Sequence, residues 1–430
     1  MAPENNTPHY ARNLIAFTGD TVAFIVATSF IDTTTVLPAF ASLLTSSAPL
    51  IGLISTMQSG GWLFPQLIAA NYVANKPYKK PYILRPLLIG RPVYLLLAAI
   101  TLLWARSHPA LTLMALYLAT AIFYTADGLA SVPWFDVLGK AIPGRRRGRY
   151  LALAQVSAGI LSIGAGLAVR RLLDPQSGLA FPRNYSALFA IAFGFYTLST
   201  FFLLLIKEPV ETTHTERTAW RQYLPMLVET LRRDHVFRRV IIGRLLAGLA
   251  GMAVPFFILF GTEALRLSQA IVGVSLTAQV VGRVLGGLLL GLGVEKLGHR
   301  LTLLGGLTLT SLAPALALLI SLAHTALSPA WVMYLFPAIF FFIGVSMNTV
   351  MWGFTNYVLD IAPPQERATY VGLANTLTGL LIIAPPLGGA ILQLTSFPVL
   401  FALAFGIYLL ALLTARKLPP VVGAQAATDA

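Results

Sequence analysis

The chain has 430 residues, of which 57% are hydrophobic and only 11% are charged. A soluble domain usually carries charge on about a quarter of its residues, so this composition excludes an ordinary soluble fold and favours a membrane protein. Cysteine is absent, which excludes disulfides and thiolate metal sites.

Apolar runs recur along the whole chain, and each is long enough to cross a bilayer as an α-helix of about 20 residues. We predict helices because a helix satisfies its own backbone hydrogen bonds in lipid. We expect no cleaved signal peptide, because no short apolar run with a cleavage site opens the chain. The predicted spans are 17–43, 48–73, 83–105, 109–139, 149–171, 186–206, 239–263, 268–293, 300–322, 328–360, 368–393 and 397–416.

The spacing of these spans predicts an all-α membrane protein with twelve transmembrane helices, six in each half. The first half covers residues 1–206 and the second covers 239–418. Residues 207–238 form the only long polar segment between spans and are predicted to be a cytoplasmic linker. We expect residues 419–430 to be a mobile cytoplasmic tail.

One stretch of sequence occurs twice and indicates that the two halves share a design. Aligning Pro143 with Pro363 sets an offset of 363 − 143 = 220 residues. The same offset relates two earlier basic loops without a gap. The matched pairs are Arg147 with Arg367, Tyr150 with Tyr370, Leu153 with Leu373, Ala154 with Ala374, Lys76 with Lys296, and Lys80 with Arg300.

Basic residues gather in the even-numbered loops and in the linker. The positive-inside rule therefore predicts that both termini and the linker are cytoplasmic, and we expect a multi-pass protein of the cell (inner) membrane. This topology also explains the net charge of +14, so we expect no nucleic-acid partner.

The paired basic loops contain a sequence motif, G-x-x-x-[DE]-[RK]-x-G-[RK]-[RK]. The second loop fits it through Gly291, Glu295, Lys296, Gly298 and Arg300. The first loop departs, with Asn71, Asn75 and Tyr78 at the glycine, acid and second glycine positions, but it keeps Lys76, Lys79 and Lys80.

With six plus six helices and this motif, the chain resembles the major facilitator superfamily of secondary transporters. The resemblance implies the fold of that family and transport by alternating access, and it identifies no substrate.

Charged residues at the cytoplasmic helix ends form a predicted gating motif. We expect Glu295 to pair with Arg367, and Asp136 to pair with the basic loop around Arg147, as latches that form and break during transport. The alternative is that these charges only anchor helix ends at the lipid headgroups. The motif comprises Lys76, Lys80, Asp136, Arg147, Gly291, Glu295, Lys296, Gly298, Arg300 and Arg367.

Asp127 is the strongest candidate among the polar residues inside the membrane, where charge is costly. It lies about a dozen residues from the cytoplasmic end of its helix, near the midplane at 1.5 Å per residue. Tyr124, Ser131 and Trp134 share its face at helical spacing. We expect Asp127 to carry a proton or meet a cation, and the alternative is a structural carboxylate.

Other charged residues have open interpretations. Asp32 lies in the run I-D-T-T-T-V-L-P, which predicts either a binding role or a helix kink. Arg283 and Gln279 share a face, and we expect them to bind an anionic group or to place Arg283 as counter-ion to an aspartate. Asp20 is interpreted as an interface residue and Arg91 as a snorkelling side chain.

Neutral side chains complete the candidate cavity. Gln58 and Trp62 recur at four-residue spacing on the second predicted helix, and Asn348 and Trp352 do so on the tenth. Such stripes indicate either ligand contacts or polar contacts between helices.

These observations predict a secondary active transporter of a small organic solute, coupled to an ion, with the proton as the expected ion. The chain has no phosphate-binding G-x-x-x-x-G-K-[ST] loop, so we do not expect ATP to drive transport. We also do not expect an enzyme, a cofactor or a metal. The alternatives are a membrane assembly factor or receptor with the same fold that does not transport, and a uniporter driven by the solute gradient. We expect a monomer whose partners are the solute, the coupling ion and the bilayer. The charge of the solute is left open.

Overall fold

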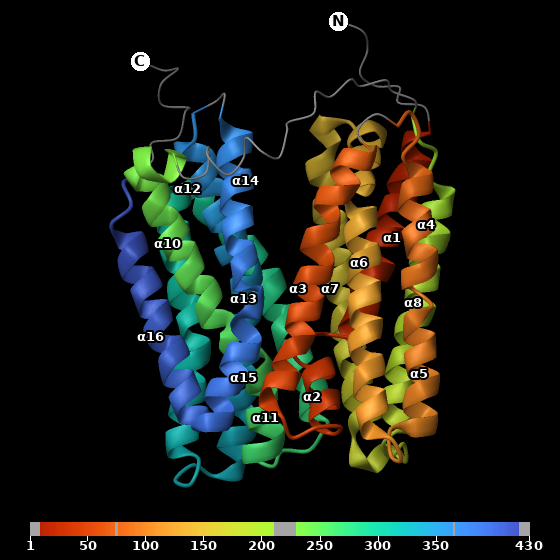
Figure 1. Ribbon diagram of the computed structural model, residues 1–430, viewed down its shortest axis with the longest axis vertical. Coiled ribbons are helices and arrows are strands. Elements are labelled where there is room, and N and C mark those ends of the chain that lie inside the picture. Colours follow the sequence, from red (N-terminus) through yellow and green to blue (C-terminus); the bar gives the residue numbers. More distant parts are fainter. Residues whose placement is uncertain (1–8, 74–75, 210–228, 364–365, 421–430) are drawn as a thin grey trace, which may run out of the picture. The chain divides into compact units, whose positions relative to one another are not determined.

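The computed structural model describes residues 9–73, 76–209, 229–363 and 366–420, without the side chains of 67, 145, 149, 290–296, 348, 349, 351, 352 and 368. This part of the chain is helical and contains no strand (Figure 1). The α-helices are α1 (Tyr10–Phe30), α2 (Val36–Ser42), α3 (Ala48–Val73), α4 (Lys80–Gly90), α5 (Val93–Trp104), α6 (Pro109–Ala141), α7 (Gly144–Leu173), α8 (Arg183–Leu205), α10 (His235–Ala250), α11 (Val254–Leu259), α12 (Ile271–Ala323), α13 (Pro329–Ile361), α14 (Arg367–Thr378), α15 (Ala384–Leu394) and α16 (Phe397–Arg416). Short helical turns lie at Pro175–Ser177, Gly251–Ala253, Phe260–Ala264 and Gly379–Ile383.

The described residues contain 11 helical segments that are long and apolar enough to cross a membrane. The one predicted span missing from this group is 48–73, which corresponds to α3. This helix has 26 residues, but Gln58, Gln66 and Asn71 interrupt its apolar sequence. The all-α membrane fold with about twelve long helices is therefore confirmed.

The first predicted span breaks into two helices, as the run of threonines around Asp32 indicates. The carboxylate oxygen Oδ1 of Asp32 accepts hydrogen bonds from the backbone N–H groups of Thr34 and Thr35, both at 2.9 Å. The hydroxyl groups of the same two threonines also donate to it, at 2.6 and 2.9 Å. Asp32 thus holds the turn between α1 and α2.

Gly298 marks a change of direction inside α12. Its backbone has φ 75° and ψ 169°, a conformation that a residue with a Cβ atom rarely adopts. The second glycine of the basic-loop motif therefore lies at the kink between the two helical parts of α12.

The chain divides into two compact units. Unit 1 comprises Met1–Ser46, Leu53–Arg217 and Ser268–Thr277, and unit 2 comprises Ser47–Gly52, Thr218–Leu267 and Ala278–Ala430. The predicted boundaries at residues 206 and 239 stay a prediction, because residues 210–228 of the predicted linker and 421–430 of the predicted tail lie outside the described part.

The hydrophobic cores of the two units carry the repeat seen in the sequence. In unit 1 the rings of Phe17 and Tyr150 pack with centroids 6.3 Å apart, and in unit 2 Phe237 and Tyr370 pack at 4.6 Å. Both pairs are related by the sequence offset, since 237 − 17 and 370 − 150 both equal 220. Further buried core pairs at this offset are Ile83 with Leu303, Leu87 with Leu307, Leu138 with Val358, and Ala154 with Ala374.

Side chains at the start of α4 and the end of α8 hold unit 1 together at one end. The Glu208 carboxylate accepts from the backbone N–H groups of Lys79 and Lys80, with a shortest distance of 2.8 Å to each. In return, the Lys80 ammonium donates to the carbonyl groups of Leu204 and Ile206, both at 2.7 Å. An acid thus meets a helix N-terminus and a cation meets a helix C-terminus, as the helix dipoles favour.

A basic residue and an acid are paired near the helix ends of each unit, and only the basic partners keep the 220-residue offset. Asp136 pairs with Lys79 and, at 3.3 Å, with Lys140, and in unit 2 Asp360 pairs with His299. Lys79 and His299 are again 220 residues apart.

Asp136 meets the basic loop around Arg147 through Lys140, at 3.3 Å. The guanidinium of Arg147 itself donates to the backbone carbonyls of Gly139 and Ile142, at 2.7 and 3.1 Å. These carbonyls lie at the end of α6, where helical partners are lacking.

Two glycines allow the close helix contacts of unit 1 that position the residues around α6. A Cβ atom at Gly128 would lie 2.6 Å from the backbone oxygen of Trp62, and one at Gly90 would lie 2.5 Å from the Cβ atom of Ala126. Without side chains at these points, α3 and α4 approach α6 on either side of Asp127.

We predict that Glu208→Ala lowers the melting temperature of the purified protein. Losing a helix cap costs about 0.5–2 kcal/mol of the free energy of unfolding. Glu208→Gln keeps an acceptor oxygen and should lower the melting temperature less. An equal loss in both variants, measured in the same detergent, would contradict the capping role.

We also predict opposite effects for two identical glycine substitutions. Gly128→Ala should destabilise the protein, because the new methyl group meets a backbone oxygen that cannot rotate away. Gly164→Ala in α7 is the matched control, since nothing lies within 4 Å of its added Cβ, and it should keep or raise the melting temperature. Equal melting temperatures would show that α3 and α6 do not approach as described.

Candidate functional site

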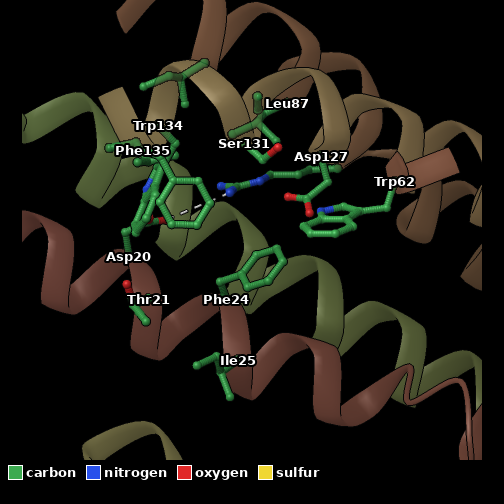
Figure 2. A pocket seen from close by; sticks show the side chains of 14 residues that line it. Asp20, Thr21, Phe24, Ile25, Trp62, Leu87, Asp127, Ser131, Trp134 and Phe135 are labelled. Atoms are coloured by element: carbon green, nitrogen blue, oxygen red, sulfur yellow. Dashed lines mark hydrogen bonds and ion pairs between the residues drawn. The ribbon is translucent and has the colours of Figure 1, made fainter. Parts of the chain in front are cut away.

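A cavity of about 260 Å³ lies within unit 1 and is lined from α1, α3, α4, α6, α8 and the α4–α5 junction. Its three charged residues lie in membrane-spanning helical segments. Figure 2 shows the cavity with Asp20 beside Trp134 at one end and Asp127 beside Trp62 at the other. Its charged and aromatic lining residues are Asp20, Arg91, Asp127, Phe24, Trp62, Trp134 and Phe135.

Asp20 on α1 has partners at both carboxylate oxygens. The indole N–H of Trp134 donates to Oδ2 at 2.8 Å, and the hydroxyl of Ser199 donates to Oδ1. A guanidinium nitrogen of Arg91 lies 4.0 Å from the same Oδ1. Asp20 is only 5% exposed, so its carboxylate is enclosed by the helices of unit 1, and its placement at the membrane interface stays a prediction.

Arg91 is buried at the point where α4 ends and Pro92 interrupts the helix. It is 4% exposed, and its guanidinium donates to the backbone oxygen of Tyr196 at 2.7 Å, to Thr200 and to the Ser199 hydroxyl at 3.0 Å. Its guanidinium carbon also lies 5.9 Å from the ring centroid of Tyr196. Arg91 therefore does not snorkel to the surface, and α8 holds it inside the unit.

Asp127 on α6 is partly exposed to the cavity rather than enclosed by protein. It interacts electrostatically with Arg91 and hydrogen-bonds with Trp62 of α3, whose indole N–H is the only donor that side chain has. In Figure 2 its carboxylate and the Trp62 ring lie side by side. The cavity thus brings together the predicted residues Asp127, Ser131, Trp134 and Trp62.

Tyr124 and Gln58 form a separate polar cluster outside this lining. The amide group of Gln58 donates to the Tyr124 hydroxyl at 3.4 Å, and its amide oxygen accepts from the hydroxyl of Thr33 at 2.6 Å. Asp32 holds the α1–α2 turn with its threonine bonds, which favours the kink over the binding role. Gln58 therefore makes polar contacts between helices, which is the structural alternative to a ligand contact for this residue.

The candidates of the second half lie in unit 2. Gln279 is fully buried and its amide group lies 3.5 Å from the Met347 sulfur. Arg283 is partly buried on the same helix, one turn later. The side chains of Asn348 and Trp352 lie outside the described part, so their role stays a prediction, as does the role of Arg283 as a counter-ion.

The predicted gating residues have diverse surroundings. Lys76 lies 5.5 Å from the ring centroid of Tyr72, Arg300 donates to the backbone oxygen of Arg416 at 2.8 Å, and Arg367 is exposed at the start of α14. The side chains of Gly291, Glu295 and Lys296 are not described, and pairing of Glu295 with Arg367 stays a prediction.

Sequence reasoning missed the buried roles of Asp20 and Arg91, although the repeat contains a signal for them. At the 220-residue offset, Asp20, Arg91 and Asp127 correspond to Val240, Ser311 and Met347. The three charges of the cavity therefore all break the repeat. Within the described residues, no group of three His, Asp or Glu side chains is placed to hold a metal ion.

Several solved structures share this fold at low sequence identity. They include the nucleoside transporter NupG (D323A mutant; 13% identity, 94% of this chain and 100% of that chain, TM-score 0.70) and a bacterial homologue of the iron transporter ferroportin (13%, 95% and 98%, TM-score 0.71). A D-xylose–proton symporter is also similar (15%, 94% and 98%, TM-score 0.67). At these identities the likeness shows the fold alone. No curated protein sequence matches the chain significantly.

A family model extends the comparison to sequence. The model described as Major Facilitator Superfamily matches residues 22–382 and, again, residues 240–429. The first match alone covers most of the chain and includes Arg91 and Asp127. The protein therefore belongs to the Major Facilitator Superfamily.

Proposed function

We propose that this protein is a secondary active transporter that moves a small organic solute by alternating access and couples it to protons at Asp127. The observation that carries the proposal is a carboxylate on the wall of a cavity within membrane-spanning helices, beside a buried ion pair. Intramembrane charge is expensive and is kept mainly where ions or solutes pass.

The surroundings of the two acids support a division of roles. Asp20 receives two hydrogen bonds and faces the guanidinium of Arg91, so both of its carboxylate oxygens already have partners within the protein. Asp127 lines the cavity, and its interaction with Arg91 is weaker than that of Asp20. Of the two, Asp127 is the group suited to gain and lose a proton as the cavity changes sides.

The family and the similar structures support transport as the coarser function. The D-xylose–proton symporter among them is an example of proton coupling on this fold, and a non-transporting receptor or assembly factor remains the rival. Reconstituted vesicles separate the two. A panel of labelled solutes is offered to the vesicles with an imposed pH gradient, and we expect at least one solute to enter protein-containing vesicles faster than protein-free ones. If no solute moves faster with the protein, whichever side of the membrane it is added to, the receptor or assembly factor is favoured.

We predict that Asp127→Asn abolishes solute accumulation driven by a pH gradient, because asparagine keeps the shape of the side chain and cannot titrate. Exchange of labelled for unlabelled solute needs no net proton movement, so it should be reduced less than accumulation, with any loss confined to the affinity for the solute. Both are measured in vesicles by the uptake of the labelled solute.

Asp32→Asn is the control for this prediction. It removes an acid of the same unit that holds a turn instead of facing the cavity, so uptake should keep its response to the pH gradient even if the melting temperature falls. An unchanged response in Asp127→Asn would show that the proton binds elsewhere.

A further inference from the structure

The charge balance of the cavity specifies the solute more closely than the family does. We propose that the cavity of unit 1 binds an organic cation with a single positive charge and an aromatic or branched apolar body. This inference rests on the proposed transport function and assigns the cavity as its solute site.

The first argument is that Arg91 is already committed to the protein. Its two terminal nitrogens donate to Tyr196, Ser199 and Thr200 of α8 and face Asp20. An anionic solute would have to displace these bonds and would meet the negative charge of Asp127. The guanidinium therefore serves as a fixed internal counter-ion to Asp20.

The second argument is that the neutral hydroxyl groups of the cavity are also committed. The Thr21 hydroxyl bonds to the Tyr150 hydroxyl at 2.8 Å, and the Ser131 hydroxyl donates to the backbone oxygen of Gly128 at 2.9 Å. A sugar needs many hydrogen-bonding partners, because unpaired buried polar groups are costly. These hydroxyl groups do not favour such a solute.

The third argument is the charge that remains. Asp20 and Arg91 cancel, so ionised Asp127 leaves the cavity with one negative charge. Aromatic rings surround the cavity, and the face of an aromatic ring attracts a cation within about 6 Å. The lining is otherwise apolar, which suits a solute with a compact apolar body. These rings are Phe24, Trp62, Trp134 and Phe135.

Three probes of similar shape and different charge test the inference. Phenyltrimethylammonium carries a permanent positive charge, tert-butylbenzene is its neutral isostere, and benzoate is an anion. Binding to the purified full-length protein is measured by quenching of tryptophan fluorescence and by the shift of melting temperature. We expect the cation to bind roughly tenfold to a hundredfold more tightly than the neutral isostere, as a charge-assisted contact implies, and benzoate to bind most weakly.

Variants that change the charge count test whether Asp127 and the ion pair set this preference. Asp127→Asn and Asp20→Asn should each weaken phenyltrimethylammonium binding about tenfold or more, because either leaves the cavity neutral. The double variant Asp20→Asn/Arg91→Gln restores one negative charge and should recover most of the affinity lost in Asp20→Asn. If Asp20 had a purely structural role, the double variant would bind phenyltrimethylammonium more weakly than Asp20→Asn alone.

Size-exclusion profiles and melting curves show whether each variant is folded, and a variant that does not fold is replaced by Asp20→Ser or Arg91→Met with the same charge count. The inference is overturned if the neutral or anionic probe binds wild-type protein as tightly as the cation, or if no probe binds at millimolar concentration. It is also overturned if Asp127→Asn keeps wild-type affinity for the cation. Proton-driven uptake of a neutral or anionic solute by the same preparation would refute the cation class and leave the proposed transport function intact.

Discussion

The buried guanidinium of Arg91 is the constraint on which the architecture of unit 1 depends. A charge inside a membrane-spanning bundle must be paired and hydrogen-bonded, because leaving it uncompensated is strongly destabilising. Three elements supply the compensation: α1 brings Asp20, α8 brings the hydroxyl groups and a backbone carbonyl, and the break at Pro92 lets the side chain turn inward. Once Arg91 and Asp20 neutralise each other, the second acid on the cavity wall becomes the variable charge.

The two units show how a repeated scaffold carries a site that is not repeated. Core pairs such as Phe17 and Phe237 keep the 220-residue offset, and so do the basic residues Lys79 and His299 in the ion pairs at the helix ends. Each of these residues makes its core or ion-pair contacts within its own unit. The three charged residues of the cavity lie in unit 1, and the residues of unit 2 at the same offset are uncharged. The repeat therefore includes the scaffold and excludes the site.

The sequence was sufficient to predict the helices and the repeat, because these features follow from local hydrophobic length and from matching residues at a fixed offset. It also identified Asp127, Trp62 and Trp134 as polar or aromatic groups on faces that turn inward. It could not place Asp20, which lies near the start of the predicted span 17–43 but at the middle of α1, and which is buried by partners 114 and 179 residues away. Such burial depends on packing between distant helices, and hydropathy contains no information about it. The sequence also could not identify which basic residues contact Asp136, because Lys79 comes from a distant part of the chain.

The central claim is that Asp127, and not Asp20, is the carboxyl group of the cavity that exchanges protons. Infrared difference spectra of the purified protein between mildly acidic and neutral pH test it directly, since a buried carboxyl group gains a distinct C=O absorption when it is protonated. We predict that wild-type protein shows this absorption on acidification and that Asp127→Asn lacks it. An absorption that persists unchanged in Asp127→Asn and disappears in Asp20→Asn would contradict the account.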